Sequence, residues 1–198
     1  VTLGVPRIKE IINAAKIIST PIITAKLQNE RSLPSARIVK GRVEKTLLGD
    51  IAKYIDQVVT GDGVCLRIEL DLAAIQALQL TDRISVSSVQ ASLIKAPRLL
   101  KLAGPGGVQV LTASESTILL KLALNSQNST ATFFAMQQLR RALPNVVVAG
   151  IASVGRAVIN DLGSATYNLL VEGYGLREVM TTEGIVGAET TSNHIAEI

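Results

Sequence analysis

Tryptophan is absent from this sequence, and the other aromatic side chains are scarce. Three Tyr and two Phe give an aromatic fraction of 3%, whereas hydrophobic residues as a whole reach 47% of the 198 residues. The core must therefore be aliphatic, built from Ile, Leu, Val and Ala. So few aromatic rings also argue against a base-stacking platform for single-stranded nucleic acid.

Cysteine and histidine occur once each, as Cys65 and His194. A single cysteine excludes an internal disulfide framework and fits a reducing compartment. Zinc needs several Cys or His ligands, and these two residues lie far apart in the sequence. We therefore expect no metal site, a packed thiol at Cys65, and a surface or helix-capping role for His194. A small hydrolase with His194 as its general base is the weakest alternative.

Charged residues are also few, at 18% of the chain, although the formal net charge is +4. Soluble domains usually have roughly 25%. Two explanations stay open: a partner covers part of the surface, or an aliphatic core carries a surface rich in Ser and Thr. No apolar run reaches the roughly 18 to 20 residues of a membrane-spanning helix, so we expect no membrane partner.

The spacing of hydrophobic residues predicts a mixture of short helices and strands, which is an α+β fold. Helices are expected from Pro6 to the break at 19–21, over 48–59, 72–80 and 82–95, from Phe133 to Leu143, and over 176–180 and 190–198. Strands are expected over 22–27, 37–46, 64–70, 108–113, 117–124, 146–151, 156–161 and 166–173. Asp71 is predicted to cap one helix, and Ser192 or Asn193 to cap the last.

Two glycine patterns resemble phosphate loops. GIASVGRA, at 150–157, has the spacing of a P-loop, but Arg156 and Ala157 stand where Lys and Ser or Thr are required. GPGG, at 104–107, is not followed by the start of a helix. We interpret both as strand and turn glycines.

Carboxylates that could hold magnesium come closest together at Glu69 and Asp71, which share a strand face. Arg67 lies beside them, so an ion pair between Arg67 and Glu69 is the simpler interpretation. No set of residues therefore predicts a catalytic group in this chain.

The basic residues fall into small groups rather than one dense run. Two groups are candidates for phosphate contacts: Arg7, Lys9 and Lys16, and then Lys40, Arg42 and Lys45. Such contacts would be salt-sensitive and would not read base sequence. A solvated charged face is the alternative for each group.

Longer stretches resemble a known family. VTLGVPRIKEIINAAK (1–16) and STPIITAKL (19–27) resemble the segment that follows the trigger loop in the largest subunit of multisubunit RNA polymerases. LLVEGYGLREVM (169–180) and TTSNHIAEI (190–198) are similar to a later part of the same cleft-forming region. Between them, RIVKGRVEKTLLGDIAKYI (37–55) most resembles the jaw of RNA polymerase III largest subunits. The likeness spans nearly the whole chain.

The resemblance implies a discontinuous cleft segment, residues 1–35 and 146–198, with an α+β jaw domain inserted at 36–145. It implies a non-catalytic part of a nuclear, DNA-templated nucleotidyltransferase that makes transfer RNA and 5S ribosomal RNA. The catalytic Mg²⁺ of the whole enzyme would be bound elsewhere, by an NADFDGD loop that this sequence lacks. The trigger loop would lie just before Val1.

The same resemblance implies roles and partners. Pro6 and Arg7 would support the base of the trigger loop, and the segment would help to wall the channel for downstream DNA. The second-largest subunit and a small zinc-ribbon cleavage subunit would be its protein partners.

Two positions depart from the family pattern. Glu189 stands where family members tend to have Arg before TTSN, which weakens any phosphate-binding role there, and GPGG departs from the jaw sequences. The alternative to the family interpretation is a standalone intracellular α+β interaction module without catalytic activity.

Overall fold

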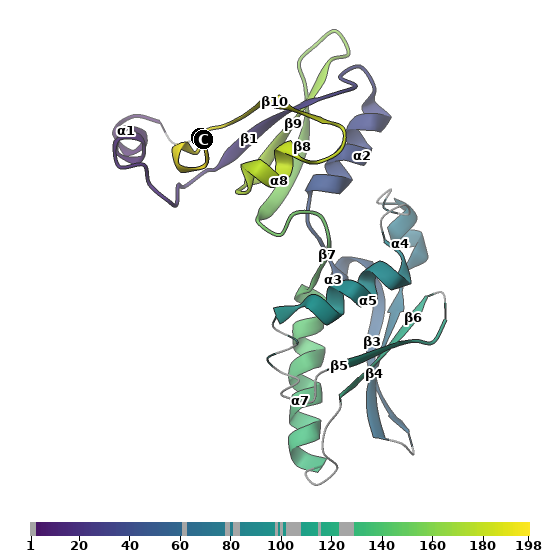
Figure 1. The fold of residues 1–198 in the computed structure, drawn as a ribbon. Helices are drawn as coiled ribbons and strands as arrows, with labels where there is room; N and C mark the ends of the chain where they lie inside the picture. The colour runs from purple at the N-terminus through teal and green to yellow at the C-terminus, as the bar shows by residue number, and fades with distance from the viewer. Residues whose placement is uncertain are drawn as a thin grey trace. The chain divides into compact units, whose positions relative to one another are not determined.

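The computed structural model divides the chain into two compact units (Figure 1). It describes residues 3–60, 63–77, 80, 84–97, 99, 101, 108–114, 116–122 and 129–198. Unit 1 comprises Val1–Lys45 and Gly150–Ile198, and unit 2 is Thr46–Ala149. Unit 1 is therefore discontinuous in sequence, with unit 2 inserted in it.

Unit 1 is built on a four-stranded antiparallel sheet with the strand order β10-β1-β9-β8. The strands are β1 (Ile22–Leu27), β8 (Val154–Asp161), β9 (Tyr167–Gly173) and β10 (Ile185–Ser192). Alternate residues of β1 are buried, namely Ile23, Ala25 and Leu27, because successive side chains of a strand point to opposite faces. One face of this sheet therefore builds the core of unit 1.

Helices α2 (Leu33–Val43) and α8 (Leu176–Met180) pack against this sheet (Figure 1). The core between sheet and helices includes Val39 and Val43 of α2 and Val179 of α8. In contrast, α1 (Val5–Ile12) has no buried residue. A short 3-10 helix, η3, covers Ile195–Glu197.

Unit 2 has its own four-stranded antiparallel sheet, with the order β3-β4-β6-β5. The strands are β3 (Ala52–Thr60), β4 (Gly63–Leu70), β5 (Val108–Thr112) and β6 (Thr117–Leu122). Leu66 and Ile68 of β4 lie opposite Leu120 and Ile118 of β6, and all four are fully buried. These aliphatic pairs form the centre of the second core.

Helices complete the core of unit 2. Those whose residues the structure describes are α3 (Leu48–Ile51), α4 (Leu72–Ala77), α5 (Val86–Lys95), α7 (Ser129–Ala142) and the 3-10 helix η2 (Leu143–Asn145). A small sheet also pairs β2 (Thr46–Leu47) with β7 (Val147–Ala149). Leu93 of α5 and Met136 and Leu139 of α7 are buried in this core. Asp71 caps α4 as predicted, since its Oδ1 accepts a hydrogen bond from the Ala74 N–H at 3.0 Å.

The predicted α+β class is confirmed. The strands expected over 22–27, 64–70, 156–161 and 166–173 and the helix over 176–180 also form. The GPGG stretch at 104–107 lies outside the described residues. Within the part of the chain that the structure describes, no helix is both long and apolar enough to cross a bilayer.

The strand predicted over 37–46 is wrong, because most of it belongs to α2. Ser32 caps this helix by accepting a hydrogen bond from the Ser35 N–H at 3.4 Å. Ala36, Val39 and Val43, spaced three and four residues apart, are buried on one side of the helix.

The helix predicted over 48–59 is also wrong. Only α3, at Leu48–Ile51, is helical, and β3 begins at Ala52. Strand β3 pairs with β4 along its length, with Ile55 opposite Ile68 and Val58 opposite Cys65. Cross-strand packing of β-branched side chains therefore outweighs the helical spacing of the apolar residues.

Both ends of unit 1 contain less helix than predicted. Helix α1 ends at Ile12, well before the break at 19–21. At the other end, β10 continues to Ser192, because Thr191 pairs with Thr24 and Ser192 with Ile23. The cap of η3 is therefore His194, not Ser192 or Asn193.

Within α7, Met136 and Leu139 are buried, whereas Phe133, at the same helical spacing, is 50% exposed. Its ring instead makes an edge-to-face contact with Phe134, with 6.4 Å between ring centroids.

Candidate nucleic-acid interface

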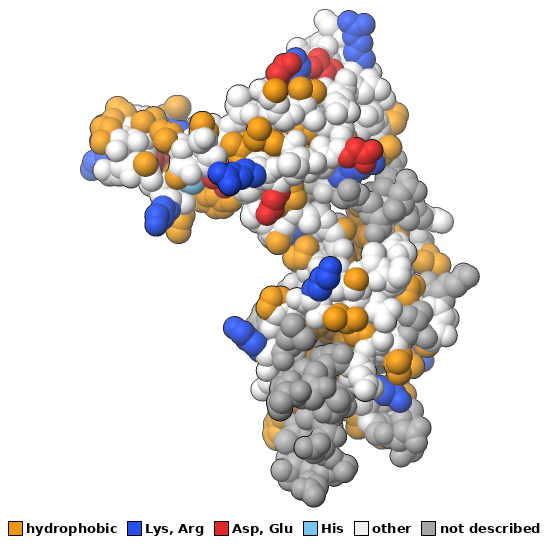
Figure 2. Space-filling view, viewed as in Figure 1, with side chains coloured by type: hydrophobic (Ala, Val, Ile, Leu, Met, Phe, Trp, Pro, Cys, Tyr) orange, Lys and Arg blue, Asp and Glu red, His pale blue; other side chains and the backbone are white. Residues whose placement is uncertain are grey.

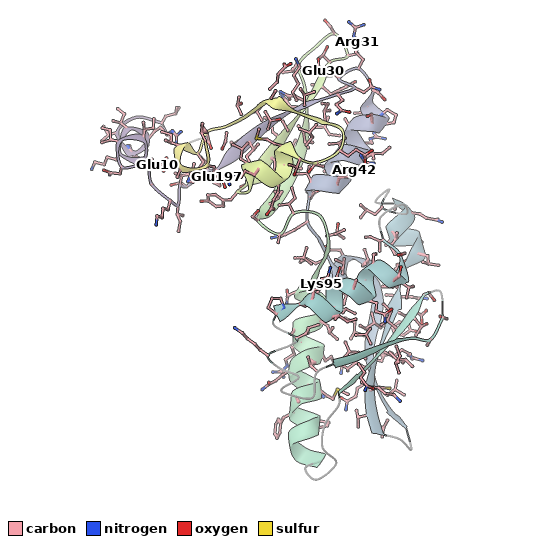
Figure 3. The ribbon with its side chains drawn as sticks, viewed as in Figure 1. Glu10, Glu30, Arg31, Arg42, Lys95 and Glu197 are labelled. Carbon is pink, nitrogen blue, oxygen red and sulfur yellow. The ribbon has the colours of Figure 1, made fainter. Side chains whose placement is uncertain are left out.

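All six predicted phosphate-contacting residues lie in unit 1. Arg7 and Lys9 are on α1 and Lys16 follows it, whereas Lys40 and Arg42 are on α2 and Lys45 follows that helix. Helices α1 and α2 lie well apart in this unit (Figure 1), and Figure 3 labels Arg42 on α2. The residues therefore form two separate groups, not one continuous basic surface.

In the α1 group, Arg7 is already engaged. Its Nη1 lies 3.1 Å from Glu10 Oε2, and its Nη2 donates a hydrogen bond to the carbonyl of Asn193. The hydrogen bond from Arg7 lowers the pKa of the Glu10 carboxyl. Lys9 and Lys16 are exposed and form no ion pair within the described residues, so their charges are available to a phosphate.

In the α2 group, two of the three side chains are balanced by glutamates. Lys40 lies 3.6 Å from Glu44, and Arg42 lies 3.0 Å from the carboxylate of Glu183. Lys45 forms no ion pair among the residues described. Of the six candidate residues, Lys9, Lys16 and Lys45 are therefore the ones without an ion pair among the described residues.

Glu189, which stands where family members tend to have Arg before TTSN, forms an ion pair within the sheet of unit 1. Its carboxylate pairs with Lys26 of β1, which also lies 3.2 Å from Glu30. Both carboxylates raise the pKa of Lys26, and Glu189 has the larger effect. Glu189 thus pairs with a cation on the neighbouring strand and does not offer a positive charge to a phosphate.

His194 is buried, so of the two positions predicted for it the surface one is wrong, whereas the helix-capping one is confirmed by its place as the N-cap residue of η3. Only 3% of the residue is exposed. Its Nε2 donates a hydrogen bond to the Ala15 carbonyl at 3.0 Å, and its ring meets Tyr174 edge to face. The other ring nitrogen, Nδ1, is buried and has no hydrogen-bond partner among the described residues, so no nucleophile lies where this nitrogen could take its proton. The packed thiol predicted at Cys65 is confirmed, since that residue is buried.

The ion pair predicted between Arg67 and Glu69 is replaced by another arrangement. Arg67 Nη2 lies 3.3 Å from Asp56 on β3, and its guanidinium lies over the Tyr54 ring, 5.4 Å from the centroid. Glu69 instead accepts a hydrogen bond from the Tyr54 hydroxyl, which raises the pKa of that phenol. Among the described residues, no three His, Cys, Asp or Glu side chains gather where they could hold a metal ion.

The surface of α1 is unusually apolar. Val5, Ile8, Ile11 and Ile12 are exposed to between 43% and 77%, and Figure 2 shows hydrophobic side chains gathered over this helix. Lys9 lies on the same helix. An exposed apolar patch of this kind is typical of a surface that other protein covers.

Sequence reasoning missed two residues that organise this end of unit 1. Asn193 hydrogen-bonds Thr20 and Ile22, and the Tyr174 hydroxyl hydrogen-bonds Ile18. These partners are between 156 and 173 residues away in sequence. No local motif signals such contacts.

Comparison with known proteins identifies the family. The family model described as RNA polymerase Rpb1, domain 5, matches residues 1–198. The chain is 46% identical to the DNA-directed RNA polymerase III subunit RPC1 of Debaryomyces hansenii over 213 residues, 43% to that of Saccharomyces cerevisiae over 206, and 44% to that of Homo sapiens over 201. Each match covers 100% of this chain and 14% of the relative.

These matches confirm the resemblance to the largest subunit of RNA polymerase III and favour it over a standalone interaction module. The chain spans about 14% of the length of the curated relatives it matches. This chain belongs to the RNA polymerase Rpb1 domain 5 family and corresponds to that segment of the RNA polymerase III largest subunit.

Proposed function

We propose that this chain is the non-catalytic cleft and jaw portion of DNA-directed RNA polymerase III. The match of one family model to residues 1–198 carries the proposal. The whole protein would belong to a nuclear, DNA-templated nucleotidyltransferase that makes small untranslated RNAs such as transfer RNA and 5S ribosomal RNA. Its catalytic Mg²⁺ would be bound by other parts of the enzyme, because the described residues offer no cluster of acidic ligands.

The division of the chain into two compact units agrees in kind with a cleft segment that contains an inserted jaw. Unit 1 is discontinuous in sequence, as expected of a cleft segment, and unit 2 is the insertion expected of a jaw. The units divide after residues 45 and 149, whereas the sequence suggested boundaries after 35 and 145. We propose unit 1 as cleft and unit 2 as jaw.

Downstream DNA is the proposed nucleic-acid partner. Lys9, Lys16 and Lys45 would contact its phosphates, since their charges are not balanced by a neighbouring carboxylate among the described residues. Pro6 and Arg7, at the first turn of α1, would support the base of the trigger loop. The jaw surface would contact the small zinc-ribbon subunit, and the second-largest subunit would be a further neighbour.

The dependence of DNA binding on salt tests the phosphate contacts. The test uses polymerase III whose full-length largest subunit carries this chain, bound to a downstream duplex. Replacing Lys9, Lys16 and Lys45 together by Ala should reduce the slope of log K against log salt by up to about 0.9 for each phosphate that is no longer neutralised. Lys40→Ala is the matched control with a smaller expected change, because Glu44 already balances Lys40. An unchanged slope in the triple variant would contradict the proposed contacts.

A further inference from the structure

A set of polar contacts joins α1 to the C-terminal end of unit 1. On one side are Arg7 of α1 and Ala15 of the loop that follows it, and on the other are Asn193 and His194, just before η3. Figure 3 shows Glu10 of α1 and Glu197 of η3 at the same end of the unit. Glu10 also accepts hydrogen bonds from Ser19, which extends the contacts into the loop that follows α1.

Asn193 uses both its backbone and its side chain in these contacts. Its backbone N–H donates to the Ile22 carbonyl at 3.0 Å, and its Oδ1 accepts from the Ile22 N–H at 2.8 Å. Its Nδ2 donates to the Thr20 carbonyl at 2.8 Å, and its own carbonyl accepts from Arg7. One residue therefore fixes the start of β1 and the position of α1 together.

His194 holds the loop between these two elements with the help of Tyr174. The His194 Nε2 donates to the Ala15 carbonyl at 3.0 Å, and the two rings meet with centroids 5.3 Å apart. The Tyr174 hydroxyl hydrogen-bonds both the N–H and the carbonyl of Ile18, each at 3.2 Å. Since His194 is almost fully buried, its hydrogen bond is sheltered from competition with water.

Packing within unit 1 does not provide an alternative support for α1. None of its residues is buried, and none belongs to the core of unit 1. An element with few buried apolar contacts has low local stability. The polar contacts, rather than burial, therefore determine where α1 lies within unit 1.

We propose that Asn193 and His194 are positioning residues for nucleotide addition. They do not touch the reacting groups and act through α1, which carries Pro6 and Arg7. This inference rests on the proposed function, in which Pro6 and Arg7 support the base of the trigger loop. Loss of the Asn193 side chain would free the segment that presents the Asn193 carbonyl to Arg7, and loss of the His194 ring would free the loop after α1. Either change would shift α1 and with it that support.

The experiment measures single-nucleotide addition by polymerase III whose full-length largest subunit carries this chain. Asn193→Ala and His194→Ala should lower kcat about 10-fold, within the roughly 100-fold that a 1 Å misplacement can cost. The KM for nucleotide should change little, because neither residue contacts the substrate. His194→Gln should recover part of kcat, since its amide group retains a donor for the Ala15 carbonyl. Thr191→Ala, on an exposed position of β10, is the matched control and should leave kcat unchanged.

Arg7→Ala separates this inference from the function on which it rests. If Arg7→Ala lowers kcat while Asn193→Ala and His194→Ala match Thr191→Ala, the positioning role is wrong and the support by Arg7 stands. If Arg7→Ala leaves kcat unchanged, the proposed support of the trigger loop is wrong, and this inference with it. Should the alanine variants not assemble, His194→Phe keeps a ring against Tyr174 but removes the donor to Ala15, and a kcat equal to that of Thr191→Ala would overturn the positioning role.

Discussion

Gly150 lies where the chain returns to unit 1 after β7, and its backbone requires glycine for two reasons. Its φ is +81°, and a Cβ atom there would overlap the carbonyl group of Glu44. A non-glycine residue with positive φ costs about 1 to 3 kcal/mol before any clash is counted. The sequence singled out this glycine through its spacing in GIASVGRA, but its role is the close approach of two backbone segments.

Gly150→Ala should therefore destabilise the chain more than Gly163→Ala does. Gly163 has a similar φ of +89°, but nothing lies within 4 Å of its Cβ position. It thus shares the conformational cost of about 1 to 3 kcal/mol without the clash. Urea unfolding followed by circular dichroism measures both variants. Equal losses of unfolding free energy would show that the contact with Glu44 is unimportant.

The contacts that hold α1 should depend on pH through the carboxylate of Glu10. Its hydrogen bond with Arg7 lowers the pKa of the carboxyl below its ordinary value of 4.5. A lowered pKa in the folded state means that the carboxylate stabilises the fold above pH 4.5, and that this contribution is lost as pH falls through the folded-state value. An NMR titration of the Glu10 side chain should give a midpoint below 4.5 that rises in Arg7→Gln. A midpoint that does not respond to Arg7→Gln would contradict this link.

At the scale of elements, the sequence pattern predicted the strands in which apolar and polar residues alternate, and those that are continuously apolar. Strand β4 is the clearest example, since Leu66, Ile68 and Leu70 are buried as the alternation requires. The wrong prediction of a helix over 48–59 arose because the same residues fit both the spacing of a helix and the composition of a strand. Over residues 48–59, the helical spacing of Ile51, Ile55 and Val58 coincides with β-branched side chains, and only the pairing of β3 with β4 decides that 52–59 is a strand.

The pairing of β3 with β4 predicts how substitutions act on unit 2. Ile68 is fully buried opposite Ile55 of β3, so Ile68→Ala should cost about 2 to 5 kcal/mol of unfolding free energy. Val59, on β3, is 74% exposed, and Val59→Ala should cost less than about 1 kcal/mol. Thermal unfolding followed by circular dichroism compares the two variants. A similar loss for both would mean that the packing of this sheet is described wrongly.

At the scale of the whole molecule, the sequence predicted the family and the fold class. It identified the basic residues but not their ion pairs, because Arg42 meets Glu183 across 141 residues of sequence. Asn193 and His194 could not be recognised as anchors for the same reason, since their partners near the start of the chain are fixed only by the fold.

Crosslinking in the assembled enzyme tests the central claim most directly. Photoreactive amino acids would replace Lys16 in unit 1 and Lys53 in unit 2, both exposed, in the full-length largest subunit of polymerase III bound to template DNA. The account predicts crosslinks from Lys16 to downstream DNA, and from Lys53 to downstream DNA or to the small zinc-ribbon subunit. An assembled, active enzyme in which neither position reaches downstream DNA or that subunit would contradict the assignment of this chain to cleft and jaw.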